Sequence, residues 1–328
     1  MQKKNWLIAG LSALVAVLLV AVTALTVVLL MKDGGGSSSS SGGDKTASSS
    51  VSDGNKTASA PSGGSMTVAL PGDVKLELVK VEAGSFEMSA KDGENFGDEV
   101  PHRVTLTKDF YLGKTEVTQA QWKAVMGNDP SYFKGDALPV ESVSWYDAMA
   151  FCEKLNEMGK APKGYKFTLP TETQWEYAAR GGRKSRGYKY SGSDNIGEVA
   201  WYYENSGDRR LDERELLKDF TVDKLVKNLK DNNCQTHPVA GKKANELGLY
   251  DMSGNVWEWC LDDYNSDSSK AVPEFARSAD DSRGSERVTR GGRWNFGARF
   301  CRSAGRGRGG PGARVIDVGF RLALVPVQ

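Results

Sequence analysis

The chain has 328 residues, with 43 Lys and Arg against 42 Asp and Glu, and only two histidines. This near-zero net charge argues against a nucleic-acid partner, because proteins that bind nucleic acids usually carry a clear cationic excess. With His102 and His237 alone, a metal site built from several histidines is excluded. Four cysteines in so long a chain do not make the disulfide framework of a miniprotein, and 39% hydrophobic residues are enough for one sizeable core.

Residues 1–32 are predicted to form a transmembrane anchor. The stretch from Trp6 to Met31 has no charged residue. About 20 apolar residues span a bilayer, whereas the apolar part of a signal peptide is roughly 7–15 residues long, so we favour an uncleaved anchor. No cysteine lies near its end, so lipoprotein processing is not indicated. Because Lys3 and Lys4 precede the stretch, we expect the N-terminus in the cytoplasm and the rest of the chain outside, at the cell surface or in the periplasm.

Residues 33–66 are rich in Gly and Ser. Such a composition cannot bury enough apolar surface to offset the entropy lost on ordering, so it predicts a flexible linker. A single folded domain, residues 67–328, remains after it.

Short apolar runs at the start of this domain predict strands. They are Leu76–Val81, Arg103–Thr107 and Phe110–Leu112. The domain also contains helices and long loops, and this mixture predicts an α+β fold rather than alternating βαβ units.

Three helices are predicted from their capping residues. In chain order these are Thr118 before residues 119–126, Ser144 before residues 145–158, and Thr171 at the start of the third helix. Gly127 follows the first helix and is the residue type that commonly ends one. Gln174 completes a capping box with Thr171, in which two side chains satisfy backbone N–H groups reciprocally.

Residues 208–233 are more charged than their surroundings and are interpreted as a surface insertion. Leu216, Phe220, Leu225 and Leu229 recur in it at roughly helical spacing. The insertion could contact a partner, but a solvated amphipathic helix is the favoured interpretation.

Five motifs occur in order between about residues 75 and 323. They read VEAGSFEM, PHRVTLTKDFYLGKTEVTQAQW, LPTETQWEYAARGG, GLYDMSGNVWEWC and RGGRWN…CRSA…GFR. Together they closely resemble the formylglycine-generating-enzyme (sulfatase-modifying factor) family. The resemblance implies an α+β fold that is a variant of the C-type lectin fold. It is a weaker guide to function, since one fold hosts many activities.

The resemblance also bears on catalysis. The family's oxidase activity depends on two cysteines near the C-terminus that bind copper, and soft thiolates suit Cu(I). Phe296 stands where the first of them would be. Cys301 is either a structural cysteine of the family, whose disulfide partner would fall at Ala179, or the second catalytic cysteine. In both cases the pair is broken, so we expect no copper and no oxidase activity.

Residues 290–321 resemble the variable region of a target protein of a diversity-generating retroelement. Relatives often carry an Asn-rich segment here that aligns without a gap. The differences cluster at the Asn-like places, together with Arg293 and Gly312, and spare a framework that includes Trp294 and Cys301. Every differing residue has a codon ending in C, which is what adenine-directed mutagenesis of AAC codons produces. The predicted ligand-binding residues are Arg293, Phe296, Gly297, Phe300, Gly305, Gly307, Arg308, Gly309, Gly310, Gly312, Ala313, Val315, Ile316 and Asp317.

Two other interpretations of this segment are less favoured. Ordinary divergence of a glycine-rich loop would not explain why the changes avoid the framework. An RNA-binding tract, suggested by RGRGGPGAR, does not suit a segment that closes the fold of a domain outside the cytoplasm.

A binding site tolerates such variation when other residues hold its backbone. We expect Trp294, Cys301, Ala304 and Phe320 to do so, while the varied side chains point outward. Phe296 and Phe300 would then be aromatic anchors. The six glycines from Gly297 to Gly312 predict a flat or concave, sterically open surface.

Charge suggests one class of ligand. Residues 283–328 contain ten arginines and two acidic residues, and such a surplus would suit a ligand with carboxylates, phosphates or sulfates. Framework arginines such as Arg302 and Arg321 are more often structural, so internal pairing is the favoured interpretation for these two.

A structural calcium ion is also implied by the resemblance. The family's ligands would fall at Asp251, Gly254, Val256 and Glu258, and oxygen donors of this kind suit Ca²⁺. An equally weighted alternative is that Glu258 only bonds to backbone amides in the core.

The sequence therefore predicts a non-catalytic, surface-displayed ligand-binding protein with a diversified C-terminal surface. Its partner would be an unidentified protein or surface ligand, with an acidic one suggested by the charge. The alternatives are an oxidase or other enzyme of the same family, and a structural or regulatory module that uses an unvaried surface.

Overall fold

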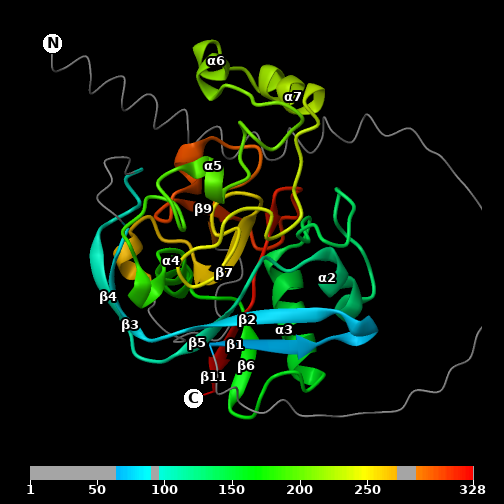
Figure 1. Cartoon of the computed structure of the whole chain (residues 1–328), viewed down its shortest axis with the longest axis vertical. Coiled ribbons are helices and arrows are strands. Elements are labelled where there is room, and N and C mark those ends of the chain that lie inside the picture. The colour runs from blue at the N-terminus through cyan, green and yellow to red at the C-terminus, as the bar shows by residue number, and fades with distance from the viewer. Residues whose placement is uncertain (1–63, 90–95, 272–285, 328) are drawn as a thin grey trace, which may run out of the picture.

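A computed structural model describes residues 64–89, 96–271 and 286–327 (Figure 1). The predicted anchor and nearly all of the predicted linker lie outside these residues. Within the described ranges, no helix is both long and apolar enough to cross a bilayer. The predicted α+β fold is confirmed, because helices and mostly antiparallel strands share one core.

The larger sheet has five strands in the order β1-β2-β5-β11-β6. Their bounds are Ser65–Ala69 for β1, Lys75–Val81 for β2, Phe110–Gly113 for β5, Ala323–Pro326 for β11 and Tyr165–Thr168 for β6. All neighbours are antiparallel, and the C-terminal strand β11 lies between β5 and β6. β1 begins inside the range predicted as linker, because Met66 is buried and pairs with Leu78.

The three predicted helix starts are confirmed. Helices α2 (Gln119–Met126), α3 (Trp145–Glu157) and α4 (Glu172–Ala179) each begin with a complete capping box. Gly127 ends α2 in the left-handed region, at φ 76°, which only Gly adopts without strain. α2 and α3 pack together through stacked Trp122 and Phe151, which lie in the core below the large sheet.

A second sheet of four strands carries the C-terminal motifs, in the order β10-β7-β8-β9. Its strands are β10 (Val318–Gly319), β7 (Trp257–Asp263), β8 (Arg287–Arg290) and β9 (Arg306–Gly309). The hairpin of β3 (Gly84–Met88) and β4 (His102–Leu106) stands apart from both sheets. α4, which is buried along its whole length, contacts β3, β7 and β8 and so joins these layers.

The remaining elements are short. They are α5 (Ile196–Val199), α6 (Glu213–Lys218) and α7 (Val222–Asp231), with the 3₁₀ turns η1 (Pro71–Asp73), η2 (Gly182–Lys184), η3 (Ser268–Lys270) and η4 (Ala298–Cys301). α6 and α7 come from the predicted insertion and project at the top of Figure 1, at the opposite end of the molecule from β11.

The insertion is more than a solvated helix. Leu216 of α6 and Leu225, Val226 and Leu229 of α7 are buried in one cluster with Trp294 and Ile316. The sequence periodicity predicted the apolar face, but it could not show that this face packs on residues 290–321, the segment predicted to vary, which we call the varied segment.

Candidate functional site

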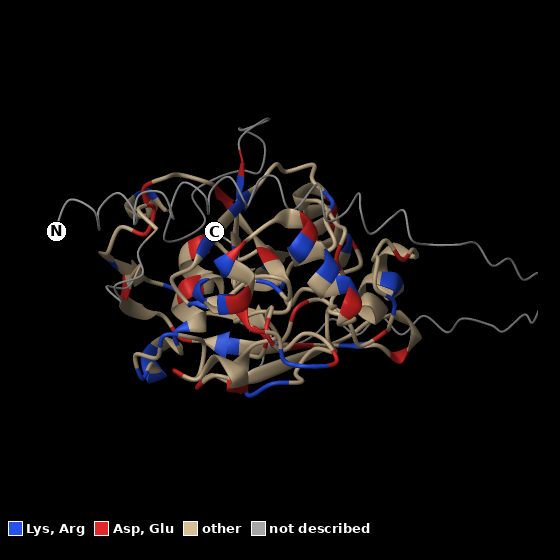
Figure 2. Ribbon diagram, turned by 90° about the horizontal axis from the view of Figure 1, so that it is seen from above, with Lys and Arg blue, Asp and Glu red and all other residues tan. Residues whose placement is uncertain are grey.

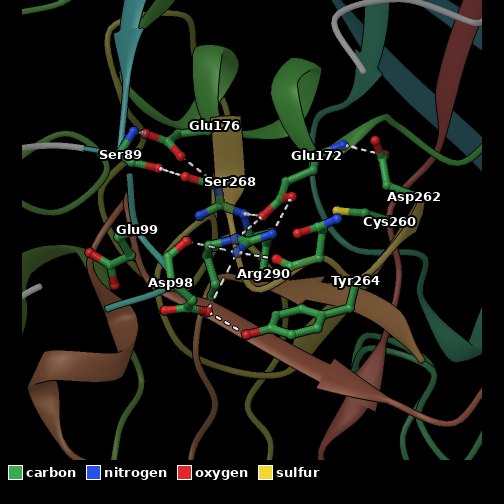
Figure 3. Close-up of polar contacts among 12 residues, drawn as sticks. Ser89, Asp98, Glu99, Glu172, Glu176, Cys260, Asp262, Tyr264, Ser268 and Arg290 are labelled. Atoms are coloured by element: carbon green, nitrogen blue, oxygen red, sulfur yellow. Dashed lines mark hydrogen bonds and ion pairs between the residues drawn. The ribbon is translucent and has the colours of Figure 1, made fainter. Parts of the chain in front are cut away.

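Buried ion pairs hold the varied segment to the rest of the fold. Arg290 lies between Glu172 and Glu176 of α4, with its Nε 3.0 Å from Glu172 Oε1 (Figure 3). Arg306 Nε lies 2.6 Å from the same carboxylate. Burial tends to raise the pKa of Glu176, but the charges of Arg180 and Arg290 outweigh it and lower that pKa. The strands β8 and β9, which pair with each other, are therefore joined to α4 by buried ion pairs.

Two further arginines, Arg302 and Arg321, form buried ion pairs of the same kind. Arg302 forms a two-pronged pair with Glu99, at 2.6 and 2.9 Å. Arg321 donates to both oxygens of Glu258, which also accepts from Trp175 Nε1 at 2.6 Å. Arg302, Glu99, Arg321 and Glu258 are fully buried, so the internal pairing predicted for the two arginines is confirmed.

Most of the arginine surplus is consequently neutralised within the chain. Ion pairs also occupy Arg287, Arg293, Arg308 and Arg314. Figure 2 shows positive and negative residues interleaved along the ribbon. The charge argument for an acidic ligand therefore loses its basis, because most of these cations already face carboxylates within the chain.

Backbone hydrogen bonds from distant elements fix the varied segment. Tyr203 N donates to Phe296 O at 2.9 Å, Trp145 N donates to Pro311 O at 3.0 Å, and Ser142 N donates to Val315 O at 3.0 Å. Trp294 is fully buried and donates to Ile316 O. The course of the segment is thus set by residues outside it.

The predicted binding residues are not equally accessible. Those that are exposed are Arg308, Gly310 and Gly312, and those partly exposed are Phe296, Phe300, Gly307, Gly309, Ala313 and Val315. The buried ones are Arg293, Gly297, Gly305, Ile316 and Asp317.

The expectation that all varied side chains point outward is wrong for three positions. Arg293 and Asp317 form an ion pair in the interior, with the Arg293 guanidinium nitrogen 2.6 Å from Asp317 Oδ2. Ile316 packs in the cluster below α7. Variation at these positions would change the support of the surface rather than the surface itself.

The expectation of a sterically open glycine surface is also wrong in part. A Cβ at Gly309 would lie 2.8 Å from the Trp259 ring, one at Gly307 2.6 Å from Thr289 Oγ1, and one at Gly305 2.7 Å from a backbone oxygen. Of the six glycines, only Gly310 and Gly312 have no atom of the described residues within 4 Å of such a Cβ. Tertiary neighbours, which a sequence does not display, fill the space at the others.

A pocket lies where the varied segment meets the insertion. Phe296, Gly297 and Phe300 form one wall, and Leu216, Leu217 and Phe220 of the insertion form the other. The hollow between these walls spans about 480 Å³ of non-protein space, a volume that includes open solvent, and most of its lining is apolar. The two phenylalanine rings meet edge to face, with their centres 4.9 Å apart.

Two residues of this pocket carry polar atoms that have no partner among the described residues. Asn295 is 95% buried and donates to Asp317 from Nδ2, but its Oδ1 accepts nothing. Arg299 stacks its guanidinium 4.8 Å from the centre of the Phe300 ring, and its Nε donates to nothing. Neither residue was among the predicted binding residues, and neither was Tyr203; the insertion was predicted, but not as a wall of this site. Asn295 could have been found, because it stands at an Asn-like place that did not change.

The chain's four cysteines are all described, and all are buried and form no disulfide. Burial raises the pKa of the Cys301 thiol to about 12, so its thiolate form is scarce at neutral pH. Cys301 is thus a free, buried thiol, and the assignment of Phe296 to the place of the family's first catalytic cysteine stays a prediction.

As they lie here, the residues implied for calcium do not fit the ion. Both oxygens of Glu258 are taken by Arg321, which brings a positive charge to the place of the metal. Asp251 accepts from Ala240 N, and burial raises its pKa to about 6. The described residues contain no group of three or more His, Cys, Asp or Glu suited to a metal. Calcium binding stays a prediction that rests on the resemblance alone.

Comparison with known proteins identifies the family. The model of the sulfatase-modifying factor enzyme 1-like domain matches residues 71–325, so the chain belongs to this family. It is 39% identical over 249 residues to the chaperone protein LppX of Paenibacillus barcinonensis, covering 66% of this chain and 78% of that protein. It is 30% identical over 226 residues to the formylglycine-generating enzyme of Mus musculus, covering 68% of this chain but only 53% of that enzyme.

Among solved structures, the chain is similar to Treponema denticola variable protein 1. The TM-score is 0.62 at 30% sequence identity, and the match covers 81% of this chain and all of that one. The resemblance seen in the sequence motifs, to the enzyme family and to a variable protein within it, is thus confirmed.

Proposed function

We propose that this chain is a non-catalytic ligand-binding protein whose varied segment and insertion together bind a hydrophobic side chain of a partner protein. The observation that carries the proposal is the apolar pocket between Phe296, Phe300 and the insertion. In this proposal the protein's folded domain is a variant of the C-type lectin fold. Residues 1–32 are a membrane anchor that holds this domain outside the cytoplasm.

The chemistry of the pocket favours a peptide as ligand. Aromatic and aliphatic walls take up an apolar group, and a few polar groups give it an orientation. Among the residues that the structure describes, Asn295 Oδ1 is an acceptor without a donor and Arg299 Nε is a donor without an acceptor. Buried polar atoms of this kind call for a partner, and the N–H and C=O of a peptide would supply both kinds.

Diversification by a retroelement is part of this proposal. The residue types at the Asn-like places, all of which can be encoded by codons ending in C, and the likeness to a variable protein support it, and residues outside the segment bond to its backbone. Sequencing the same locus from several isolates should show changes at Phe296, Phe300 and Arg308 with Trp294 and Arg302 retained. If the flanking DNA has neither an Asn-rich template repeat nor a reverse transcriptase gene, diversification fails and ligand binding stands.

Binding can be measured with a small probe. N-acetylphenylalaninamide should bind with a dissociation constant of about 1 mM or tighter in ligand-observed NMR, and N-acetylaspartamide should not. Phe296→Ala and Phe300→Ala should each weaken this binding about tenfold or more, since they remove a wall of the pocket. Arg308→Ala is the control, because Arg308 is varied and exposed but does not line the pocket.

Equal binding of both probes, or no effect of the phenylalanine variants, would contradict the proposed site. An aerobic assay with copper and a cysteine-containing peptide tests the enzymatic alternative. Turnover there would contradict a non-catalytic role.

A further inference from the structure

Gly297 differs from the other crowded glycines in what crowds it. A Cβ at this position would lie 1.7 Å from Glu213 Oε1, 2.2 Å from Glu213 Cδ and 2.5 Å from Glu213 Oε2. All three nearest atoms belong to the end of one side chain. At Gly305 the obstacle is backbone, and at Gly309 it is a buried tryptophan ring.

The backbone itself does not require glycine here. Gly297 has φ −69° and ψ 163°, an extended conformation that any residue adopts. The residue at this predicted varied position is therefore restricted by space alone, and that space is occupied by the insertion.

Glu213 stands at the start of α6, which is held less firmly than α7. α6 has six residues and buries only Leu216, whereas α7 has ten and buries Leu225, Val226 and Leu229. A segment with few buried contacts opens or shifts at low cost. A larger residue at position 297 would thus displace Glu213 and α6 before it disturbed α7.

α6 is also a wall of the pocket, since Glu213, Leu216 and Leu217 line it opposite Phe296 and Phe300. We propose that position 297 and Glu213 form a specificity-determining pair, in which the varied residue sets the position of α6 and so the width of the pocket. A change in the varied segment then alters both walls of the site, although α6 lies outside the residues predicted to vary. This inference rests on the proposed function, because width matters only if the pocket binds a ligand.

The experiment uses the whole chain without ligand and follows hydrogen exchange of residues 213–218. Gly297→Leu should speed this exchange about tenfold or more and leave exchange of the large sheet unchanged. Gly310→Leu is the matched control, because Gly310 is a predicted varied position with nothing near its Cβ, and it should leave α6 unchanged.

Combining Gly297→Leu with a second substitution distinguishes a specific contact between positions 297 and 213 from a general loosening of the structure. Glu213→Ala removes as many heavy atoms as Gly297→Leu adds, so in the Glu213→Ala background the leucine should have no further effect on α6. The inference is overturned if Gly297→Leu leaves α6 unchanged, or if it has the same effect in both backgrounds.

Binding distinguishes the two proposals. In Gly297→Leu, the affinity ratio of N-acetylphenylalaninamide to N-acetylalaninamide should change at least about fivefold, and the double variant should restore it. If exchange responds as expected but no variant binds either probe, the proposed function fails while the coupling between position 297 and α6 stands. An unchanged affinity ratio with responsive exchange would overturn the assignment of specificity to this pair.

Discussion

Arg302 and Arg308 lie close together in the same varied segment, yet their surroundings are opposite. Arg302 is fully buried against Glu99, while 42% of the Arg308 side chain is exposed beside a half-exposed Glu286. The first joins the segment to the loop before β4, and the second faces solvent. The comparison shows that one stretch of chain contains both buried residues that support the fold and exposed residues that face solvent.

The largest effect is expected when the same substitution, Arg to Met, is made at a buried and at an exposed position of the varied segment. Arg302→Met should lower the free energy of unfolding by about 3–5 kcal/mol, because it leaves the Glu99 carboxylate buried without its partner. Arg308→Met should cost less than about 1 kcal/mol, since an exposed ion pair contributes little. Urea unfolding of both variants measures the difference, and equal losses would show that the segment is not divided in this way.

A second test concerns Glu141 and its neighbour Phe133, which packs on the buried Trp294. Glu141 is fully buried and accepts from Phe133 N, and the Phe133 ring packs edge to face on Trp294. Burial raises the pKa of Glu141 to about 7. The folded state therefore holds a proton that the unfolded state has already lost above about pH 4.5, so stability should fall as the pH rises from about 4.5 to about 7.

Glu141→Gln should reduce the loss of folding stability between pH 5 and pH 7.5 by an amount on the order of 2 kcal/mol. The reason is that the amide cannot ionise, while its oxygen remains an acceptor for Phe133 N. Unfolding in urea at pH 5 and pH 7.5 measures it in both proteins. The same pH dependence with and without Glu141 would remove this residue as the cause. Asp251, whose pKa is raised to about 6, adds a loss of the same sign that should remain in the variant.

A third test sharpens the comparison at adjacent glycines. Gly309→Ala should destabilise the protein by about 1–3 kcal/mol, because its Cβ would meet the Trp259 ring at 2.8 Å. Gly310→Ala should stay within about 0.5 kcal/mol, since nothing lies near its Cβ. Thermal unfolding of the pair reports both, and a tolerated Gly309→Ala would mean that Trp259 shifts easily.

The smallest effect is expected in the reactivity of the four cysteines toward a thiol reagent. In the native protein the four cysteines should react with a thiol reagent at less than about 1% of the rate seen in urea at pH 8, because all four are buried and thiolates are the reactive form. Fast labelling of one thiol in the folded protein would show that its site opens readily.

The elements that the sequence predicted well are those decided by near neighbours. Thr118, Ser144 and Thr171 bond to backbone groups three residues ahead, so each capping box is legible in the sequence itself. The order of the five motifs likewise indicated the family to which the chain belongs. The insertion was recognised as helical by its leucines, but its packing partners Trp294 and Ile316 are far away along the chain.

The site was predicted less completely for the same reason. Phe296, Phe300 and Arg308 are accessible, whereas Arg293 and Asp317 are buried against each other. Pairing of this kind depends on how two ends of a loop meet, and nothing in the spacing of the residues reveals it. The second wall of the pocket was missed because it comes from residues 213–225.

By itself, then, the sequence determined the family, the starts of three helices and the stretch of chain that is predicted to vary, since these follow from local hydrogen bonding and from ordered motifs. Only the tertiary structure decided which residues of that stretch are displayed, that nearly all the arginines around them are neutralised, and that Glu213 fills the space above Gly297. The physical reason is that exposure, ion pairing and steric room are properties of contacts between distant parts of the chain, and folding alone brings those parts together.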